Sequence, residues 1–261
     1  MSENVLGLII FALVTLAALL IAGWRGFFRV PQGEQPSAPF WALFFGVVLF
    51  FVVVGVMNWL LRPVISAEWS HVVSGVVMAV VLALWAQLST RGRVWGMGPV
   101  GRAFVVGVAA WLIAYPLANT FGIAIELIVQ APHLEQVAVR EMKALLGQPL
   151  LFWLTAAVAV FVIPVAEEIL FRGLLQGWLV RVMHPAWAIL LSSLLFAAAH
   201  YAPSQGAYNA VIMAQLFPLG LVLGHLYRRQ RSLLAPITLH GLFNAITLAA
   251  LWLIDLYGES V

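Results

Sequence analysis

Residues 40–61 read FWALFFGVVLFFVVVGVMNWLL, an apolar run without a single Asp, Glu, Lys or Arg. A helix needs about 20 such residues to cross the hydrocarbon core of a bilayer, so this stretch predicts a membrane-spanning helix. The rest of the chain has the same character, since 64% of its 261 residues are hydrophobic and only 9% are charged. Soluble domains carry roughly a quarter charged residues. The sequence therefore predicts an all-α fold, a polytopic transmembrane helical bundle whose solvent is largely lipid.

Eight segments have the length and composition of spans, and Pro and Gly mark the joints between them. The predicted spans cover residues 4–24, 40–61, 71–90, 103–125, 150–170, 186–200, 209–227 and 234–255. Charged residues alternate with apolar ones over 126–149, which predicts an amphipathic connector on the outer face. We therefore divide the chain into residues 1–149, the N-terminal transmembrane helices with this connector, and residues 150–261, a helical core that holds most of the polar intramembrane residues.

Basic residues are distributed unevenly between the loops that alternate along the eight spans. One set of loops holds ten, namely Arg25, Arg29, Arg91, Arg93, Arg102, Arg172, Arg181, Arg228, Arg229 and Arg231. The other set holds three, namely Arg62, Arg140 and Lys143. Lys and Arg accumulate in cytoplasmic loops, so this count predicts that both termini lie outside the cytoplasm. If Arg172 lies inside the bilayer, nine against three gives the same orientation. This rule also explains the net charge of +3 without nucleic-acid binding, which needs a basic patch that the sequence lacks.

The stretch Pro164–Arg172, PVAEEILFR, places three charges in or beside an apolar helix. Each charge at mid-membrane costs about 2.5–3.5 kcal/mol, so these side chains must face protein or a water-filled cavity. Glu168 and Arg172 are four residues apart and share a helix face, which predicts an ion pair. Glu167 points about 100° away from this face. One carboxylate is thus tied to arginine, while its neighbour is available for chemistry.

Two further polar features lie in later predicted spans. Phe196 and His200 are separated by three small residues in FAAAH, and His240 and Asn244 share a helix face in HGLFN. Ionisable and polar side chains within spans indicate a functional site by default. Because each would be costly in lipid, we predict that these side chains converge with the glutamates on one polar site.

The combination suits hydrolysis of an amide bond. A carboxylate in an apolar cavity is a suitable general base, and we expect Glu167 to activate water with help from His200. Water is the expected nucleophile because the chain has no Cys and shows no activated Ser or Thr. His240 and Asn244 are expected to donate hydrogen bonds to the oxyanion that forms. These groups are sufficient for hydrolysis without a metal, so we predict no cofactor.

The three motifs, Glu-Glu-x-x-x-Arg, Phe-x-x-x-His and His-x-x-x-Asn, follow one another in this order over roughly residues 150–250. In this order they resemble the CPBP family. That family comprises the CaaX prenyl endopeptidases and their bacterial relatives, which are glutamate-dependent intramembrane proteases. Some of the bacterial relatives are associated with bacteriocin processing and self-immunity.

The resemblance implies that Glu167 acts as the water-activating base with His200, and that His240 and Asn244 form the oxyanion site. The implied supporting residues are Glu168, Arg172 and Phe196. It also implies a conical cavity that opens to the cytoplasm. We expect a multi-pass protein of the plasma membrane (the inner membrane in a bacterium). Its expected partners are the lipid bilayer and a membrane-embedded or lipid-anchored peptide or protein substrate.

Two other functions stay open. Glu167 or Glu168 with His200 and His240 would supply a recognised catalytic zinc set, although the chain has no HExxH and Asn244 would then have no role. A non-enzymatic transporter or immunity protein would use the same cavity to bind a peptide. Rhomboid-type serine chemistry is not expected, because no GxSxG-like serine occurs in a span with a partner histidine.

Overall fold

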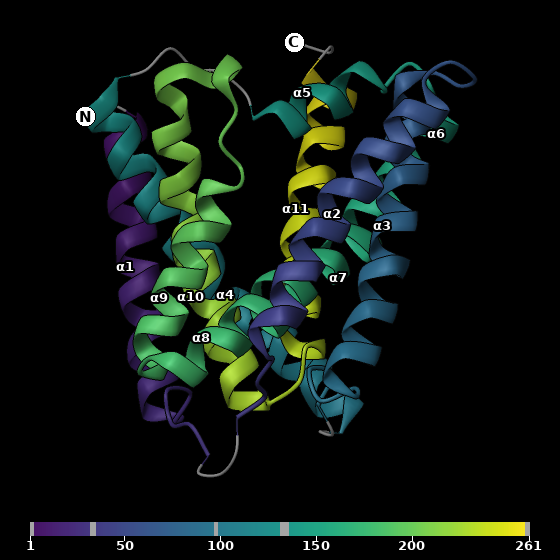
Figure 1. Ribbon diagram of the computed structural model, residues 1–261. Helices are drawn as coiled ribbons and strands as arrows, with labels where there is room; N and C mark the ends of the chain where they lie inside the picture. Colours follow the sequence, from purple (N-terminus) through teal and green to yellow (C-terminus); the bar gives the residue numbers. More distant parts are fainter. Residues whose placement is uncertain (1–2, 32–34, 97–98, 131–135, 259–261) are drawn as a thin grey trace.

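The computed structural model in Figure 1 describes residues 3–31, 35–96, 99–130 and 136–258, and these ranges are helical apart from short connections. The helices outside the central region are α1 (Glu3–Trp24), α2 (Phe40–Leu61), α3 (Ala67–Thr90), α4 (Val100–Val129), α5 (Val137–Ala144), α10 (Asn209–Gln230) and α11 (Leu234–Gly258). Within the described ranges, seven helical segments are long and apolar enough to cross a membrane. The predicted all-α, polytopic bundle is confirmed.

Residues 149–182 form one continuous helical segment of changing pitch. In chain order its parts are α6 (Pro149–Ala157), η1 (Val158–Val162), α7 (Ile163–Glu168), η2 (Ile169–Gln176) and α8 (Gly177–Val182), where η1 and η2 are π-helical. The predicted end of this span at residue 170 was wrong. Arg172 is buried and ion-paired instead of marking a loop, so its charge does not end the helix.

The next helix, α9 (Pro185–Ala198), has 14 residues. At 1.5 Å per residue it is about 21 Å long, too short to cross the bilayer. Residues 199–208, which include the short 3₁₀ helix η3 (Pro203–Tyr208), continue the path to the start of α10 (Figure 1). The bundle therefore has about eight crossings as predicted, but the crossing predicted over 186–200 is helical for only part of its length.

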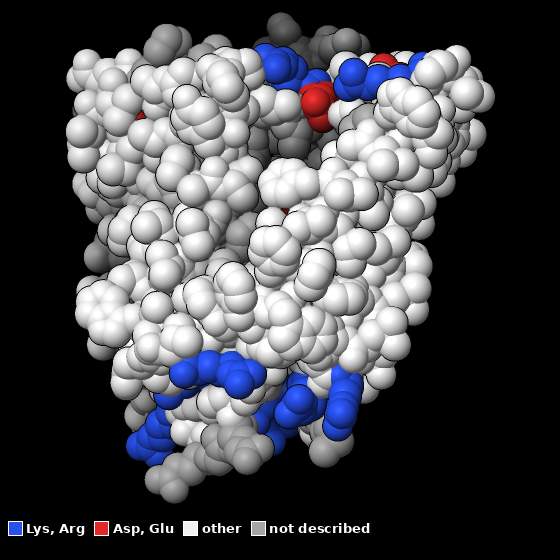
Figure 2. Space-filling view, in the orientation of Figure 1, with Lys and Arg blue, Asp and Glu red and all other residues white. Residues whose placement is uncertain are grey.

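The two ends of the bundle differ in charge. The α5 end contains α5 and both chain termini (Figure 1). The opposite end, which we call the basic end, contains the basic side chains that are blue at the bottom of Figure 2. The arginines that the helix bounds place at this end are Arg25, Arg29, Arg91, Arg93, Arg102, Arg181, Arg228, Arg229 and Arg231. Of the predicted connector 126–149, residues 137–144 form α5 at the end opposite these arginines, and residues 131–135 lie outside the described residues.

Close helix contacts occur where glycine leaves space. A Cβ at Gly107 of α4 would lie 2.6 Å from the carbonyl oxygen of Ala235 in α11. The sequence GLVLG in α10 predicts similar packing, since small residues four apart allow helices to approach. A Cβ at Gly220 would lie 3.0 Å from the Cβ of Ser193 in α9, and one at Gly224 would lie 2.7 Å from Oε1 of Gln176. This packing prediction is confirmed.

We expect Gly107→Ala to destabilise the bundle by about 1–3 kcal/mol, the usual cost of forcing extra atoms into a packed contact. The matched control is Gly55→Ala in α2, where a new Cβ has no neighbour within 4 Å. Alanine gains roughly 0.8–1.0 kcal/mol of helix propensity over glycine there, so the control should be neutral or stabilising. Thermal unfolding of the two variants in detergent measures the difference. Equal melting temperatures would contradict the close α4–α11 contact.

Candidate active site

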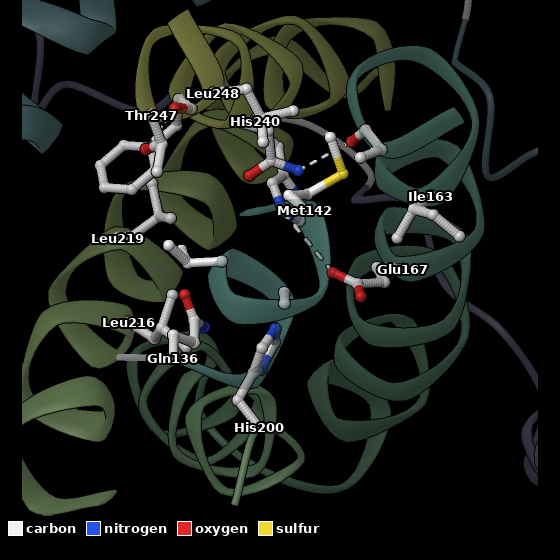
Figure 3. A pocket seen from close by; sticks show the side chains of 15 residues that line it. Gln136, Met142, Ile163, Glu167, His200, Leu216, Leu219, His240, Thr247 and Leu248 are labelled. Atoms are coloured by element: carbon white, nitrogen blue, oxygen red, sulfur yellow. Dashed lines mark hydrogen bonds and ion pairs between the residues drawn. The ribbon is translucent and has the colours of Figure 1, made fainter. Parts of the chain in front are cut away.

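A cavity of about 320 Å³ lies between the central segment 149–182, the end of α9, α10 and α11, with α5 at its edge. Its lining includes Glu167, His200, His240 and Asn244. Figure 3 shows Glu167 and His240 side by side, with His200 pointing into the cavity from across it. The structure therefore brings together the four side chains that the sequence assigned to catalysis.

Glu167, His200 and His240 lie at similar depths in the bundle, because α9 ends and α11 begins inside it. Glu167 lies 15 residues before the end of α8 at the basic end, and His200 lies 15 residues after Pro185, so each is about 22 Å from that end. His240 lies only six residues into α11, or about 9 Å. The start of α11 is itself buried, as Leu233 and Ala235 are at 0% exposure, so His240 begins from a greater depth.

The predicted ion pair is present and fully buried. Arg172 Nη1 donates to Glu168 Oε1 at 2.8 Å, and neither side chain has exposed surface. Nη2 of Arg172 donates to the carbonyl oxygen of Gly220 at 3.3 Å. The guanidinium carbon also lies 4.4 Å from the ring centroid of Phe196, at a distance typical of a cation–π contact. These contacts join the central segment, α9 and α10 around one buried charge.

His240 lies between the two glutamates, an arrangement that the sequence did not predict. Its Nδ1 is 3.0 Å from Glu168 Oε1, and its Nε2 is 3.5 Å from Glu167 Oε2. Oε1 of Glu168 also accepts from Arg172, so Nδ1 of His240 is the donor in this contact. A second proton shared between Nε2 and Glu167 would complete the chain of contacts. His240 therefore lies between the two carboxylates, with the shorter contact to Glu168.

His200 is fixed by the helix that carries it. Its Nδ1 is 2.9 Å from the carbonyl oxygen of Phe196, so Nδ1 donates and the neutral ring keeps Nε2 as an acceptor. The ring of Phe196 lies 5.0 Å from that of His200 and 5.6 Å from that of His240, centroid to centroid. Among the described residues no hydrogen bond or ion pair joins His200 to Glu167, and the cavity lies between them (Figure 3).

Asn244 is held by the first π-helical turn. Its Nδ2 donates to the carbonyl oxygen of Ala159, within η1, at 2.9 Å. The carboxamide has two N–H groups, so one remains for a ligand. π-helical turns are uncommon and occur frequently at functional sites, and here η1 and η2 lie on either side of Glu167 and Glu168. The backbone irregularity thus positions a side chain on another helix.

Two parts of the site were missed by the sequence analysis. The carbonyl group of Ala159 fixes Asn244, but an alanine gives no signal of what its backbone oxygen contacts. Gln136, Val139 and Met142 line the cavity from the α5 region. The amphipathic pattern of that region predicts a surface helix, but it does not predict that the apolar face of this helix lines the cavity.

The described part of the chain contains no group of three His, Asp or Glu side chains arranged to hold a metal ion. His240 contacts both glutamates, but His200 lies on the other side of the cavity (Figure 3). The zinc set considered from the sequence would therefore need these side chains to move together.

We expect Arg172→Met to destabilise the protein by about 3–5 kcal/mol, because it leaves the buried Glu168 carboxylate without its partner. Arg181→Met is the matched control, since Arg181 is exposed at the basic end. Adding Glu168→Gln to Arg172→Met should recover part of the loss by removing the unpaired charge. Thermal unfolding in detergent measures all three variants. An Arg172→Met variant as stable as Arg181→Met would show that the pair is not structural.

Comparison with known proteins gives a family match over the part of the chain that contains these residues. Residues 149–246 match the model of the Rce1-like family, described as type II CAAX prenyl endopeptidase. No curated protein matches the chain, and no solved structure matches it. The matched range contains all three motifs and the four polar side chains that line the cavity. Residues 149–246 are therefore similar to the Rce1-like type II CAAX prenyl endopeptidase family, in agreement with the resemblance of the motifs to the CPBP family.

Proposed function

We propose that this protein is an intramembrane endopeptidase that uses a water activated by Glu167, without a metal ion. The observation that supports this most directly is the convergence of Glu167, His200, His240 and Asn244 on one cavity. The family match supports a protease of the CAAX type. Beyond this match, we propose which groups act as the nucleophile, the base and the oxyanion donors.

Glu167 is the base in this scheme. Its side chain is 20% exposed, whereas that of Glu168 is fully buried, so Glu167 is the carboxylate that a ligand in the cavity reaches. Its buried Oε2 has no donor among the described residues apart from the long contact with His240. A water between Glu167 and Nε2 of His200 would donate one hydrogen to each, which leaves an oxygen lone pair directed at the substrate.

The proposed protonation leaves the group of ionisable side chains at the site without net charge. With a proton on each nitrogen of His240, the charges of Arg172, Glu168, His240 and Glu167 sum to zero. When Glu167 takes a proton from water, it no longer holds Nε2–H of His240. That group and the remaining N–H of Asn244 then donate to the oxyanion of the tetrahedral intermediate. Glu167 returns its proton to the amide nitrogen as the C–N bond breaks.

Access from the lipid fits a membrane-embedded or lipid-anchored substrate. A second cavity of about 390 Å³ shares Ala159, Ile163 and Glu167 with the first, and it extends to α2 and α3. An apolar groove of about 440 Å³ between the α6–η1 region and α11 shares Leu248 with the first cavity. Both are lined mainly by apolar side chains. We place the protein in the plasma membrane, where such a substrate meets the cavity without entering water.

We expect Glu167→Gln to reduce cleavage of a membrane-anchored reporter peptide by about 10²–10⁴-fold, the usual contribution of a general base. Glu68→Gln is the matched control, because Glu68 is an exposed glutamate near the start of α3 and lines neither of the two cavities that contain Glu167. Both variants are assayed as purified protein with and without a strong chelator. Activity that survives chelation and is lost in Glu167→Gln supports the metal-free mechanism. Loss on chelation with recovery by zinc supports a metalloprotease instead.

The same variant separates catalysis from binding. A transporter or immunity protein would retain peptide affinity in Glu167→Gln and would show no cleavage with the unsubstituted chain. A protease variant would bind the peptide and leave it intact, while the unsubstituted chain cuts it. Mass spectrometry of the recovered peptide distinguishes the two.

We expect Asn244→Leu to lower kcat by about 10²–10³-fold with little change in KM, as for the loss of one oxyanion donor. Leu has a similar volume and cannot donate a hydrogen bond. Thr247→Val one turn later on α11 is the control, since Thr247 also lines the cavity but bonds to its own helix at Phe243. An effect of Asn244→Leu confined to KM would place the carboxamide in substrate binding alone.

A further inference from the structure

We infer that the active-site cavity opens away from the cytoplasm, so that the substrate is a peptide segment presented on the non-cytoplasmic side of the membrane. The part of this inference that concerns a substrate rests on the proposed function, whereas the orientation is tested without measuring activity. It differs from the cytoplasmic opening that the resemblance implies. The charge-based orientation and that opening exclude each other, because the cavity lies toward the same end of the bundle as both termini.

The cavity opens toward the α5 end. Gln136, Val139 and Met142 form its edge on that side, and α5 lies at the end that carries the termini. From Val158 to Val162, between the site and the α5 end, no residue of the central segment is buried. Closer to the α5 end, Leu151, Phe152 and Ala156 of α6 are buried against Met142 and Leu145, so the central segment is less buried only beside the cavity.

The bundle is closely packed between the site and the basic end. In the turns after Glu168 the central segment has fully buried side chains at Ile169, Arg172 and Leu174. Gln176 is also buried, and its Nε2 donates to the carbonyl oxygen of Gly224 at 3.1 Å. The side chains between Glu167 and the basic end thus form a packed core, whereas the cavity beside Glu167 extends to the α5 region.

Charge distinguishes the two ends strongly. The basic end carries the nine arginines defined above, and no described Asp or Glu lies there. The α5 end carries three basic residues, Arg62, Arg140 and Lys143. Acids at the α5 end include Glu68, Glu126, Glu141 and Asp255. Figure 2 shows this contrast between the lower and upper ends.

This asymmetry predicts the orientation in the membrane. Lys and Arg close to span ends are retained on the cytoplasmic side, whereas acids contribute little. Nine against three therefore places the basic end in the cytoplasm and the cavity on the other side. The assignment does not depend on whether residues 185–208 count as a full span, because the helix bounds place each arginine at one end of the bundle.

The orientation restricts the substrate class. A CaaX tail of a cytoplasmic protein would meet only the closed basic end. The peptides that reach Glu167 are those already moved across the membrane, or those held by a span or lipid anchor with the cleavable segment outside. A translocation step must therefore supply the substrate. Hydrolysis adds hydroxyl to the acyl carbon and hydrogen to the amine, and both products remain on that side.

Cysteine labelling tests the orientation directly, because the chain has no native Cys and a single introduced thiol is unambiguous. Gly147→Cys marks the α5 end and Gly101→Cys marks the basic end. Both glycines are exposed, and a Cβ at either position has no neighbour within 4 Å. In intact spheroplasts a membrane-impermeant maleimide should label Gly147→Cys, and should label Gly101→Cys only after lysis. The reverse pattern, or equal labelling of both before lysis, overturns the inference.

A pair of reporters tests the consequence for the substrate. One carries the same cleavable peptide on the outer side of a single membrane anchor, and the other carries it on the cytoplasmic side. We expect cleavage of the outer reporter only, and its loss in Glu167→Gln. Cleavage of the cytoplasmic reporter alone overturns the inference. Cleavage of the outer reporter that persists in Glu167→Gln contradicts the proposed mechanism and leaves the orientation supported.

Discussion

Arg172 carries a positive charge in a bundle of apolar helices, and its side chain has no accessible surface. Such a charge is tolerated only when its partners are in place, since removing one partner of a buried pair costs several kcal/mol. Here Glu168 accepts from one guanidinium nitrogen, Gly220 accepts from another, and the ring of Phe196 lies against the guanidinium. Three segments that are distant in sequence are thereby fixed around one point.

The catalytic groups are built outward from this pair. Glu168 Oε1 accepts from both Arg172 and His240, so the ion pair also sets the orientation of the imidazole. His240 in turn faces Glu167, and Phe196 packs against both histidines. A buried carboxylate that fixes one ring nitrogen determines what the other nitrogen can do. The supporting residues and the proposed catalytic residues therefore form one network that cannot be divided by helix.

The cavity beside this network lies where the helical backbone is irregular. The π-helical turns on both sides of the glutamates and the early end of α9 interrupt the regular packing where the cavity lies. Non-helical backbone at membrane depth is tolerated where it lines a cavity or is buried in protein. The same arrangement leaves the cavity open toward the α5 end and closed toward the basic end, and it is this polarity that links catalysis to the side of the membrane.

The sequence by itself determined the fold class, the approximate spans and the four polar side chains that share the cavity. It did so because lipid makes every unpaired charge expensive, which leaves few explanations for Glu167, Arg172 or His240 within apolar helices. Only the tertiary structure decided the extension of the central helix to residue 182, the bridge of His240 between two glutamates and the direction in which the cavity opens. These depend on contacts between residues such as Asn244 and Ala159, which are 85 positions apart, and on backbone carbonyls that every residue type shares. The charge count was readable from the sequence, but its meaning for the active site required knowing which end the cavity faces.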